Sequence, residues 1–534
     1  MNSKKLLTLL AVLPLLAGCG QNEEKGDLVI PTVDVDSIVP VLPNRPEYNT
    51  GDIKTDGTND FIDIYELSDF HGAVNYETHS SGNYLGLPKL ASYLDIKRND
   101  NQGGTVVVSS GDMFQGSAES NLTRGYMVNY AMNYMGFDSM AIGNHEFDWT
   151  DTWLKKNANL DYKGHKTPFI SANIVKTETN ETPDFLQKST IISRKGYKIG
   201  IIGSIGKGLK SSILKSCVEG YDFLDEVDSV NAEAARLKNV ENCNIVILTS
   251  HNDIETIGSK ALENVDAVFG GHSHESKKGT ISGAAAAQTV NYGASIAHIQ
   301  LSINKETKAV SCSVCEVDEN PTQLAGLQEK AEIKTIMNNY SSAIGDIKNI
   351  KLGEADNNFT ISAGLKNVCV ESMYQGAVKA NKDNNLGIPE DKILATFHNV
   401  EGGIRKDISK GNIVYGDVYA SFPFDNEICF YKVKGSAFKG ALKYNEVVGI
   451  GVRRTFSNNN EIDDNTDYYL VVTDFIAFST DYLGAAFNIT DADLVRTGKV
   501  VRDEVANLIY KTETIKLGNF KSGVSPYVGL KRIQ

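Results

Sequence analysis

Short apolar runs alternate with amphipathic stretches through the first half of the chain, and this alternation restricts the fold more than any other feature. The runs lie at 61–67, 105–110, 138–143, 197–204, 244–250 and 265–270. Each has the length of a buried strand, and the stretch around 87–98 carries apolar residues at helical spacing. Strands and helices in alternation predict an α/β (α+β) domain with substantially buried sheets.

Polar residues follow these runs where each strand should end. They are Asp69 and His71, Asp112, Asn144 with His145 and Asp148, His251, and His272 with His274. The chain has nine histidines, and five of them lie at these positions. Because sites in open α/β folds form beyond the carboxyl ends of strands, we expect these side chains to share one pocket.

Each motif taken alone also has a structural explanation. An Asp-x-His sequence after a strand is common turn chemistry, Asp112 could cap the following helix, and His251 could be a hydrogen-bonded core histidine. These explanations require separate coincidences at the same end of successive strands. A shared metal site accounts for all of them together.

The residue types restrict the metal. Carboxylates, imidazoles and an amide oxygen without a thiolate favour Zn, Mn or Fe over Ca or an iron–sulfur cluster. Asp112 lies in the middle of the series and is the natural bridging ligand, which predicts two divalent metal ions. His145 directly follows the candidate ligand Asn144, so its side chain points in another direction and its ring can face a substrate. Asp148, three residues later, can orient that ring. The alternative for His145 is a structural role.

The first residues predict export. Lys4 and Lys5 precede an apolar stretch at 6–16, too short for a membrane-spanning helix. The sequence Leu-Ala-Gly-Cys ending at Cys19 resembles the bacterial lipoprotein box, which implies lipidation of Cys19 and a membrane-anchored protein outside the cytoplasm. The alternative is an ordinary secretion signal. Residues 20–58 are rich in Pro, Asp and Asn and predict a flexible tether.

Charge and cysteine content restrict the partners. The chain has 67 acidic and 53 basic residues, a net charge of −14, which disfavours binding of a nucleic acid polymer. Beyond Cys19, six cysteines allow 15 pairings, and spacing does not choose among them. Cys312 and Cys315 lie in an alternating segment, where buried or disulfide-bonded cysteines are expected rather than a zinc site.

The motifs DFHG, GDMFQGS, GNHEFD, a lone His after a strand and GGHSH resemble the five signatures of calcineurin-type metallophosphoesterases. Their order, with a second domain after them, resembles the 5′-nucleotidase/UDP-sugar hydrolase family over about residues 60–530. The resemblance implies a four-layer αββα catalytic domain and a C-terminal α/β substrate-recognition domain. The expected segments are 1–19 signal, 20–58 tether, 59–320 catalytic domain, 321–352 helical linker and 353–534 C-terminal domain.

The resemblance also implies roles for the polar residues. Asp69, His71, Asp112 and His274 would hold the first metal ion, and the second would be held by Asp112, Asn144, His251 and His272. His145, paired with Asp148, would form the catalytic dyad that stabilises charge on the transferred phosphoryl group or the leaving oxygen.

A second, less complete resemblance lies in the C-terminal region. The segment HNVEGGIRKDISKGNIVYGDVYASFPFDN is similar to the family's glycine loop, in which Gly402 and Gly403 approach the ligand and Arg405 contacts it. The resemblance implies that Phe424 and Phe475 clamp a nucleobase and that Asp481 contacts the ribose. Without it, either phenylalanine alone would be read as core packing.

This region departs from the family pattern at three places. Val400 stands where the family usually has Asn, with Asn399 one residue earlier and Glu401 in place of a glycine. The usual Gly-Gly-Asp-Gly stretch reads Ser-Thr-Asp-Tyr at 479–482, and no arginine lies within 359–365. These changes affect substrate identity rather than the metal chemistry.

The sequence therefore predicts an exported two-metal phosphoesterase that converts 5′-nucleotides to nucleosides and phosphate. UDP-sugar hydrolysis and 2′,3′-cyclic nucleotide cleavage are alternatives within the same class. Thiosulfohydrolases share the architecture, but the two phenylalanines argue against a substrate without a base. An inactive nucleoside-binding surface lipoprotein is the alternative from a different class.

Overall fold

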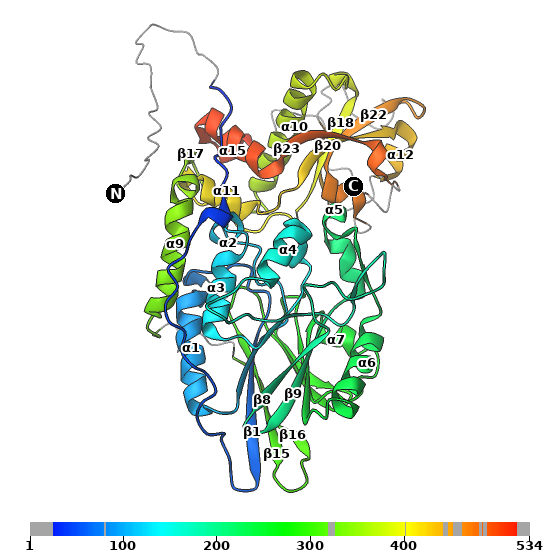
Figure 1. The fold of residues 1–534 in the computed structure, drawn as a ribbon. Coiled ribbons are helices and arrows are strands. Elements are labelled where there is room, and N and C mark those ends of the chain that lie inside the picture. The colour runs from blue at the N-terminus through cyan, green and yellow to red at the C-terminus, as the bar shows by residue number, and fades with distance from the viewer. Residues whose placement is uncertain are drawn as a thin grey trace, which may run out of the picture.

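Two sheet-containing halves lie one above the other in the molecule (Figure 1). The computed structural model describes residues 25–79, 82–318, 326–400, 402–441, 447–451, 462–479, 483, 487 and 489–520. The helix α9 (Ala331–Lys348) connects the two halves in sequence and runs along the side of the N-terminal half.

The N-terminal half contains two mixed sheets. The first has the strand order β16 (Val310–Asp318), β15 (Ile296–Asn304), β1 (Asn59–Leu67), β4 (Thr105–Ser109), β5 (Ser139–Ala141) and β6 (Phe169–Ile170). The second has the order β13 (Lys277–Ile281), β14 (Ala284–Gln288), β12 (Ala267–Gly270), β11 (Ile245–His251), β9 (Tyr197–Ile205) and β8 (Ser189–Arg194). The strands β1, β4, β5 and β6 are parallel to one another, as are β9, β11, β12 and β14.

The two sheets pack face to face because their strands are apolar on both sides. In β1, Ile62 and Ile64 belong to a core shared with the second sheet, whereas Tyr65 and Leu67 belong to a core shared with helices. Successive side chains of a strand point to opposite faces, so one short run supplies two cores. This explains the near-continuous hydrophobic runs in the sequence.

Helices cover the two outer faces. The helices α1 (Gly86–Asp100) and α3 (Tyr126–Met135) cover the first sheet, and α9 packs against these two helices. The helices α6 (Glu226–Asn239) and α7 (Ile254–Ile257) pack on the second sheet. The four-layer αββα arrangement expected from the sequence is confirmed.

The C-terminal half is also mixed α/β. One sheet has the order β21 (Val447–Gly451), β18 (Ile393–Asn399), β22 (Asp467–Thr473), β20 (Glu427–Lys434) and β23 (Leu494–Val500). A smaller sheet has the order β19 (Gly411–Val414), β17 (Lys351–Ala355) and β24 (Thr514–Ile515). The helices α10 (Leu365–Asp383), α11 (Tyr415–Ser421) and α15 (Val501–Thr512) contribute side chains to the core of the C-terminal half.

The segment 25–58 differs from the expected flexible tether, because it is attached to both halves (Figure 1). Near its start, the backbone N–H of Leu28 donates to Asn507 Oδ1 over 2.7 Å, and Asp27 pairs with Lys511 and Lys379 of the C-terminal half. Val35 is buried, with only 3% of its surface exposed.

Further along, the same segment is held by the N-terminal half. Arg45 Nε donates to the carbonyl of Asn133 over 2.8 Å, and the Tyr48 hydroxyl donates to the carbonyl of Tyr134 over 3.1 Å. The composition of this segment predicted mobility, but its scattered apolar residues find partners on two separate surfaces. Residues 25–58 are therefore held against both halves and differ in this from the expected flexible tether.

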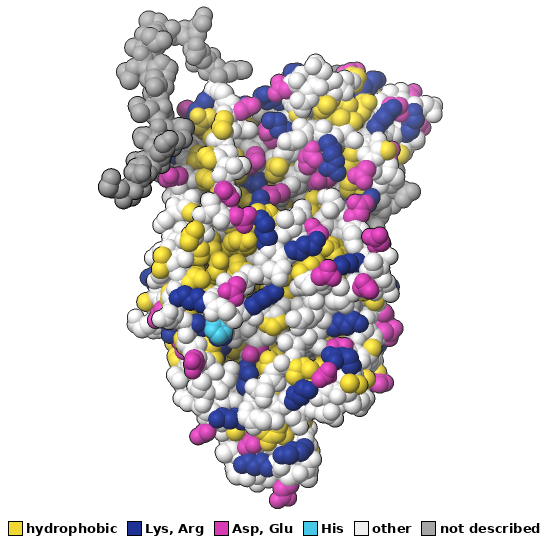
Figure 2. Space-filling view, viewed as in Figure 1, with side chains coloured by type: hydrophobic (Ala, Val, Ile, Leu, Met, Phe, Trp, Pro, Cys, Tyr) yellow, Lys and Arg dark blue, Asp and Glu magenta, His cyan; other side chains and the backbone are white. Residues whose placement is uncertain are grey.

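Cysteines and surface charge complete the description. The six cysteines of the described residues are free thiols, and Cys312 is exposed, so it is neither buried nor disulfide-bonded as expected. Figure 2 shows acidic and basic side chains interspersed over the face drawn. Within the described ranges, no helix has the length and hydrophobicity needed to cross a membrane.

Candidate active site

Two groups of side chains with metal-ligand chemistry lie together at the carboxyl ends of the parallel strands. The first contains Asp69, His71 and His274, and the second contains Asp112, His251 and His272. Within each group, the candidate ligand atoms lie within 4.8 Å of one another. Residues from the ends of β1, β4, β11 and β12 therefore meet at one place, as the strand-end pattern predicts.

Asp112 reaches both groups. Its Oδ2 lies 3.1 Å from His251 Nε2 and 4.0 Å from His71 Nε2. Asn144 joins the second group, since its Oδ1 lies 3.2 Å from His251 Nε2. The distances from Asp112 Oδ2 to a histidine of each group suit a ligand that bridges two ions.

The backbone at these positions is unusual. Left-handed backbone torsions occur at five of the candidate ligands: Asp69 (φ 51°), His71 (φ 48°), Asp112 (φ 52°), His272 (φ 71°) and His274 (φ 58°). Residues with a Cβ seldom adopt this conformation, and it concentrates at functional sites where the surrounding fold enforces it. The fold therefore holds these side chains at some conformational cost.

Hydrogen bonds orient the histidine rings. His71 Nδ1 donates to the carbonyl of Gln115 over 2.9 Å, and His251 Nδ1 donates to the carbonyl of Ser110 over 2.8 Å. These bonds place a proton on Nδ1 of each ring and turn Nε2 toward the group, where it could bind a metal ion. Backbone contacts of this kind orient metal-ligating histidines.

Glu146 is a buried support that the sequence reasoning missed. Its carboxylate accepts the N–H groups of Asp112, Met113 and Gly143 over 2.8, 2.9 and 2.8 Å. These bonds tie the ends of β4 and β5 together. Burial raises the pKa of Glu146 to about 7, and the charge of Asp112 contributes to the rise. Its position inside the GNHEFD motif, between residues with assigned roles, was the available signal.

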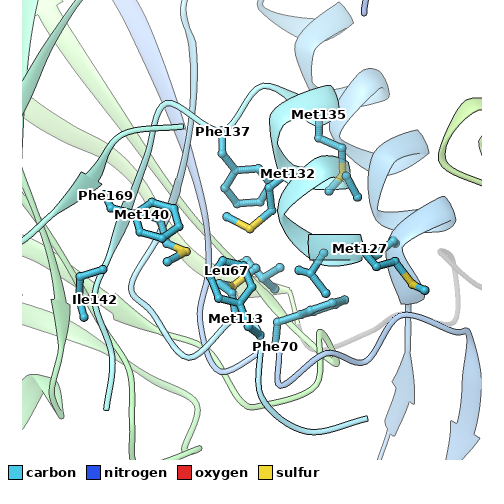
Figure 3. Packing of buried hydrophobic residues seen from close by; sticks show 14 of the residues in the cluster. Leu67, Phe70, Met113, Met127, Met132, Met135, Phe137, Met140, Ile142 and Phe169 are labelled. Atoms are coloured by element: carbon cyan, nitrogen blue, oxygen red, sulfur yellow. The ribbon is translucent and has the colours of Figure 1, made fainter. Parts of the chain in front are cut away.

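Apolar side chains next to the ligands anchor the strand ends in the core (Figure 3). Phe70 follows Asp69 and Met113 follows Asp112, and both side chains are completely buried. They pack with Leu67 at the end of β1 and with Met127 and Met132 of α3. Because each of these core residues directly follows a candidate ligand, its packing fixes the position of the loop next to that ligand.

His145 and Asp148 form the predicted pair. His145 Nδ1 lies 2.9 Å from Asp148 Oδ2. Burial by itself lowers the pKa of His145, but the carboxylates of Asp148 and Asp112 outweigh burial and leave this pKa above its ordinary value. The backbone N–H of His145 also donates to Asp112 Oδ1 over 2.8 Å. The ring is thus fixed beside the bridging position.

A cavity of about 210 Å³ extends from the second group toward the C-terminal half. The predicted residues that line it are Asn144, His145, Asp148, His272, Gly402, Arg405, Phe424 and Phe475. The Phe424 ring is stacked on the His145 ring, with centroids 5.7 Å apart. Both phenylalanines are therefore placed at the site rather than buried in the core.

Other predicted residues lie elsewhere. Gly403 does not line the cavity; a Cβ there would lie 2.4 Å from the carbonyl oxygen of Asn399, so this glycine permits the tight loop. Cys19 and Asp481 lie outside the described residues.

Several lining residues were missed by the sequence reasoning, notably Trp149, Ser212, Leu214, Asp425 and Asn426. Asn399, noted there only as displaced by one position from the family pattern, also lines the cavity.

The turn that carries Phe424 is held by charge pairs from both halves. Asp425 accepts from Arg502 Nη2 over 2.7 Å and from Arg124 Nη1 over 3.0 Å. Desolvation alone would raise the pKa of Asp425, but the two guanidinium groups keep it below the ordinary value. The proximity of Asp425 to Phe424 in the sequence was the only signal for this support.

Family comparisons agree with this division of the chain. A family described as calcineurin-like phosphoesterase matches residues 62–276, and one described as 5′-nucleotidase, C-terminal domain matches residues 394–487. The first match covers the strand ends that carry the metal-ligand groups. The second covers the glycine loop and the segment with Phe424 and Phe475.

Individual relatives are distant. Endonuclease YhcR of Bacillus subtilis is 23% identical over 470 residues, which cover 78% of this chain and 37% of that protein. The 5′-nucleotidase of Mus musculus is 24% identical over 425 residues, covering 72% of this chain and 71% of that protein. Across four of the curated relatives, the matched part is only 25% to 43% of the relative's length.

A solved structure shares the fold. The 5′-nucleotidase precursor from Thermus thermophilus matches with a TM-score of 0.68 and 18% sequence identity. The match covers 85% of this chain and 97% of that one, so both halves of the molecule are included.

Proposed function

We propose that this chain, which belongs to the calcineurin-like phosphoesterases with a 5′-nucleotidase C-terminal domain, hydrolyses 5′-nucleotides to nucleosides and phosphate. Its family makes it a metal-dependent phosphoester hydrolase. Hydrolysis of nucleotide sugars and cleavage of 2′,3′-cyclic nucleotides are the alternatives within the same class.

One observation carries this proposal. The cavity of about 210 Å³ has candidate metal ligands at one end and two half-buried phenylalanines on its wall. Stacking of a base on an aromatic ring contributes about 1–3 kcal/mol and tolerates any base. A nucleotide fits this arrangement, with its phosphate at Asn144 and His272 and its base at Phe424 and Phe475.

The residues of the site have different roles in the proposed reaction. Asp69, His71, Asp112 and His274 would hold one divalent ion, and Asp112, Asn144, His251 and His272 the other, with Zn or Mn suited to the donor set. When bound, the two ions supply positive charge to the phosphoryl oxygens and lower the pKa of the attacking water. His145 stabilises the negative charge that develops on the phosphoryl group, and Asp148 orients its ring.

We expect the site to bind a terminal phosphate group weakly. Arg405 is the one arginine or lysine among the described residues that line this cavity. A contact shared by ground and transition states affects KM more than kcat. We therefore expect a high KM for monophosphates together with broad base tolerance.

The place of action is also part of the proposal. Cys19 at the end of the lipoprotein-like signal would anchor the protein by its lipid, outside the cytoplasm. One relative, at 23% identity, is named as a cell wall protein of Listeria monocytogenes, which supports an extracytoplasmic site. We retain 59–320 as the catalytic domain, 321–352 as the linker and 353–534 as the substrate-binding domain.

A phosphate-release screen tests the reaction. The purified protein, supplied with Mn²⁺ or Zn²⁺, is assayed on nucleoside 5′-monophosphates, nucleotide sugars and 2′,3′-cyclic nucleotides, with Asp112→Ala as the inactive control. We expect release from several 5′-monophosphates. Nucleoside binding by calorimetry without turnover of any substrate would instead support an inactive nucleoside-binding protein.

A further inference from the structure

A second cavity, of about 470 Å³, opens on the other metal-ligand group. The residues that line it include His71, Tyr84, Gln115, Tyr292, Arg405 and Lys406. The first cavity reaches Asn144 and His272, whereas this one reaches His71. Arg405 lines both cavities, so the two cavities adjoin beside this residue.

Gln115 gives the second cavity a polar wall. Its side chain is 1% exposed, and among the described residues neither its Nε2 nor its Oε1 has a hydrogen-bond partner. Its backbone carbonyl accepts from His71 Nδ1, which fixes the residue beside the first metal-ligand group. Because a buried amide without partners is unfavourable, a ligand whose hydroxyl or carbonyl group displaced the cover of this amide would gain hydrogen bonds from it.

Two tyrosines give the cavity an aromatic wall. The rings of Tyr84 and Tyr292 have centroids 4.9 Å apart and are tilted by 40°. The backbone N–H of Tyr292 donates to the carbonyl of Asp69 over 2.8 Å, so this wall is tied to a candidate metal ligand. Aromatic faces beside an amide provide the contacts that sugars and nucleobases use.

The charges around the cavity balance. Arg405 and Lys406 are countered by Glu77 and Asp407, and Lys406 Nζ lies 3.1 Å from Glu77 Oε2. A second phosphate group would need an excess of positive charge here. The balance instead favours an uncharged substituent attached to the phosphate at the metal-ligand groups.

We propose that the second cavity binds the second alcohol of a phosphodiester, a sugar or nucleoside esterified to the same phosphorus as the nucleoside in the first cavity. This inference rests on the proposed function. Water adds its oxygen to phosphorus, the bond from phosphorus to one alcohol oxygen breaks, and that oxygen takes up a proton released by the water. The products are a phosphate monoester and a free alcohol.

The test compares two diesters that differ only in the second group. Thymidylyl-thymidine fills both cavities, whereas thymidine 5′-phosphate methyl ester leaves the second one nearly empty. With the Mn²⁺-loaded full chain, we expect kcat/KM to be about tenfold higher for the dinucleoside, as one additional stacked base predicts. Tyr84→Ala and Gln115→Leu should reduce this ratio toward one.

Tyr76→Ala is the matched control. Tyr76 directly precedes the strand β2 (Glu77–His79), which pairs with the strand β3 (Gly82–Tyr84) that carries Tyr84. Lys89 Nζ lies 3.6 Å from the Tyr76 ring centroid, and Tyr76 does not line the cavity. This substitution should leave the ratio of the two diesters as in the wild type. Equal kcat/KM for both diesters in the wild type, or a ratio that neither Tyr84→Ala nor Gln115→Leu lowers, overturns the inference.

Failure of the proposed function gives a different result. In that case no nucleotide is hydrolysed, and calorimetry with the same two diesters decides the matter. About tenfold tighter binding of the dinucleoside, lost in Tyr84→Ala, still supports the second cavity. Equal dissociation constants overturn the inference independently of turnover.

Discussion

Arg405 and His145 are in contact across the two halves of the molecule, with Arg405 Nη2 donating to His145 Nε2 over 3.1 Å. When the ring is neutral, Nε2 accepts this bond and the proton lies on Nδ1, directed at Asp148 Oδ2. The residue expected to stabilise the phosphoryl group is therefore already held from both sides. We expect a bound phosphate to contact both Arg405 and His145 in place of their contact with each other.

Substitution of His145 separates chemistry from metal binding. His145→Ala should lower kcat about 10²–10⁴-fold, the usual range for loss of an acid–base group, while both metal ions stay bound. Steady-state kinetics and elemental analysis of the same sample measure the two quantities. Loss of metal in parallel with activity would instead make His145 a ligand or a fold residue.

Substitution of Asp112 tests the bridge. Its Oδ2 lies within 4.0 Å of histidines from both groups, so Asp112→Ala should abolish activity and reduce metal content at both sites. Elemental analysis after dialysis measures the metal content. A variant that keeps two tightly bound ions per chain would show that Asp112 does not bridge them.

The two phenylalanines should respond differently. Phe475→Ala should impair nucleotides but leave p-nitrophenyl phosphate nearly unaffected, because the base-free substrate has nothing to stack. Phe424→Ala should also reduce turnover of p-nitrophenyl phosphate, since Phe424 stacks on His145 and lies 5.4 Å from the Arg405 guanidinium. Equal losses on both substrates in Phe475→Ala would assign that ring to packing.

A buried histidine in β18 should give stability a pH dependence. Burial lowers the pKa of His398 from 6.5 to about 4. Between these values the unfolded chain binds a proton that the folded chain does not, so the free energy of unfolding rises with pH, by about 3 kcal/mol over the window. Urea unfolding of His398→Leu should lack this contribution.

If His398→Leu and the wild type show the same slope between pH 4 and 6.5, the His398 ring is charged in the folded protein after all.

The anchor is tested by Cys19→Ser. Without the thiol no lipid can be attached, so the protein should leave the membrane fraction or remain unprocessed. Fractionation of cells followed by immunoblotting measures the partition. Unchanged partitioning of the variant would mean that another attachment exists.

The metal-ligand groups could be predicted from sequence because their signal is local. Asp69 and His71 follow one strand, Asp112 another, and the alternation with Phe70 and Met113 fixes each loop in the core. Parallel strands then bring these short segments to one edge, so strand order hardly matters for the result.

Contacts between distant segments could not be predicted in this way. Glu146 looks like any acidic turn residue until the ends of β4 and β5 place three N–H groups on it. Residues 25–58 read as a spacer, because their apolar residues have no period and partners such as those of Tyr48 and Leu28 lie 86 and 479 positions away.

Sequence by itself determined the alternation of strands and helices and the strand-end positions of the candidate metal ligands and of the His145–Asp148 pair, because these depend on spacing within single strand-loop units. The αββα arrangement followed from the family resemblance. Only the tertiary structure decided how the C-terminal half closes on them: that Arg405 reaches His145, that Asn399 lines the cavity, and that a second cavity adjoins the first. The reason is physical. Local periodicity specifies which face of an element is buried, whereas packing of two domains selects which exposed side chains become neighbours.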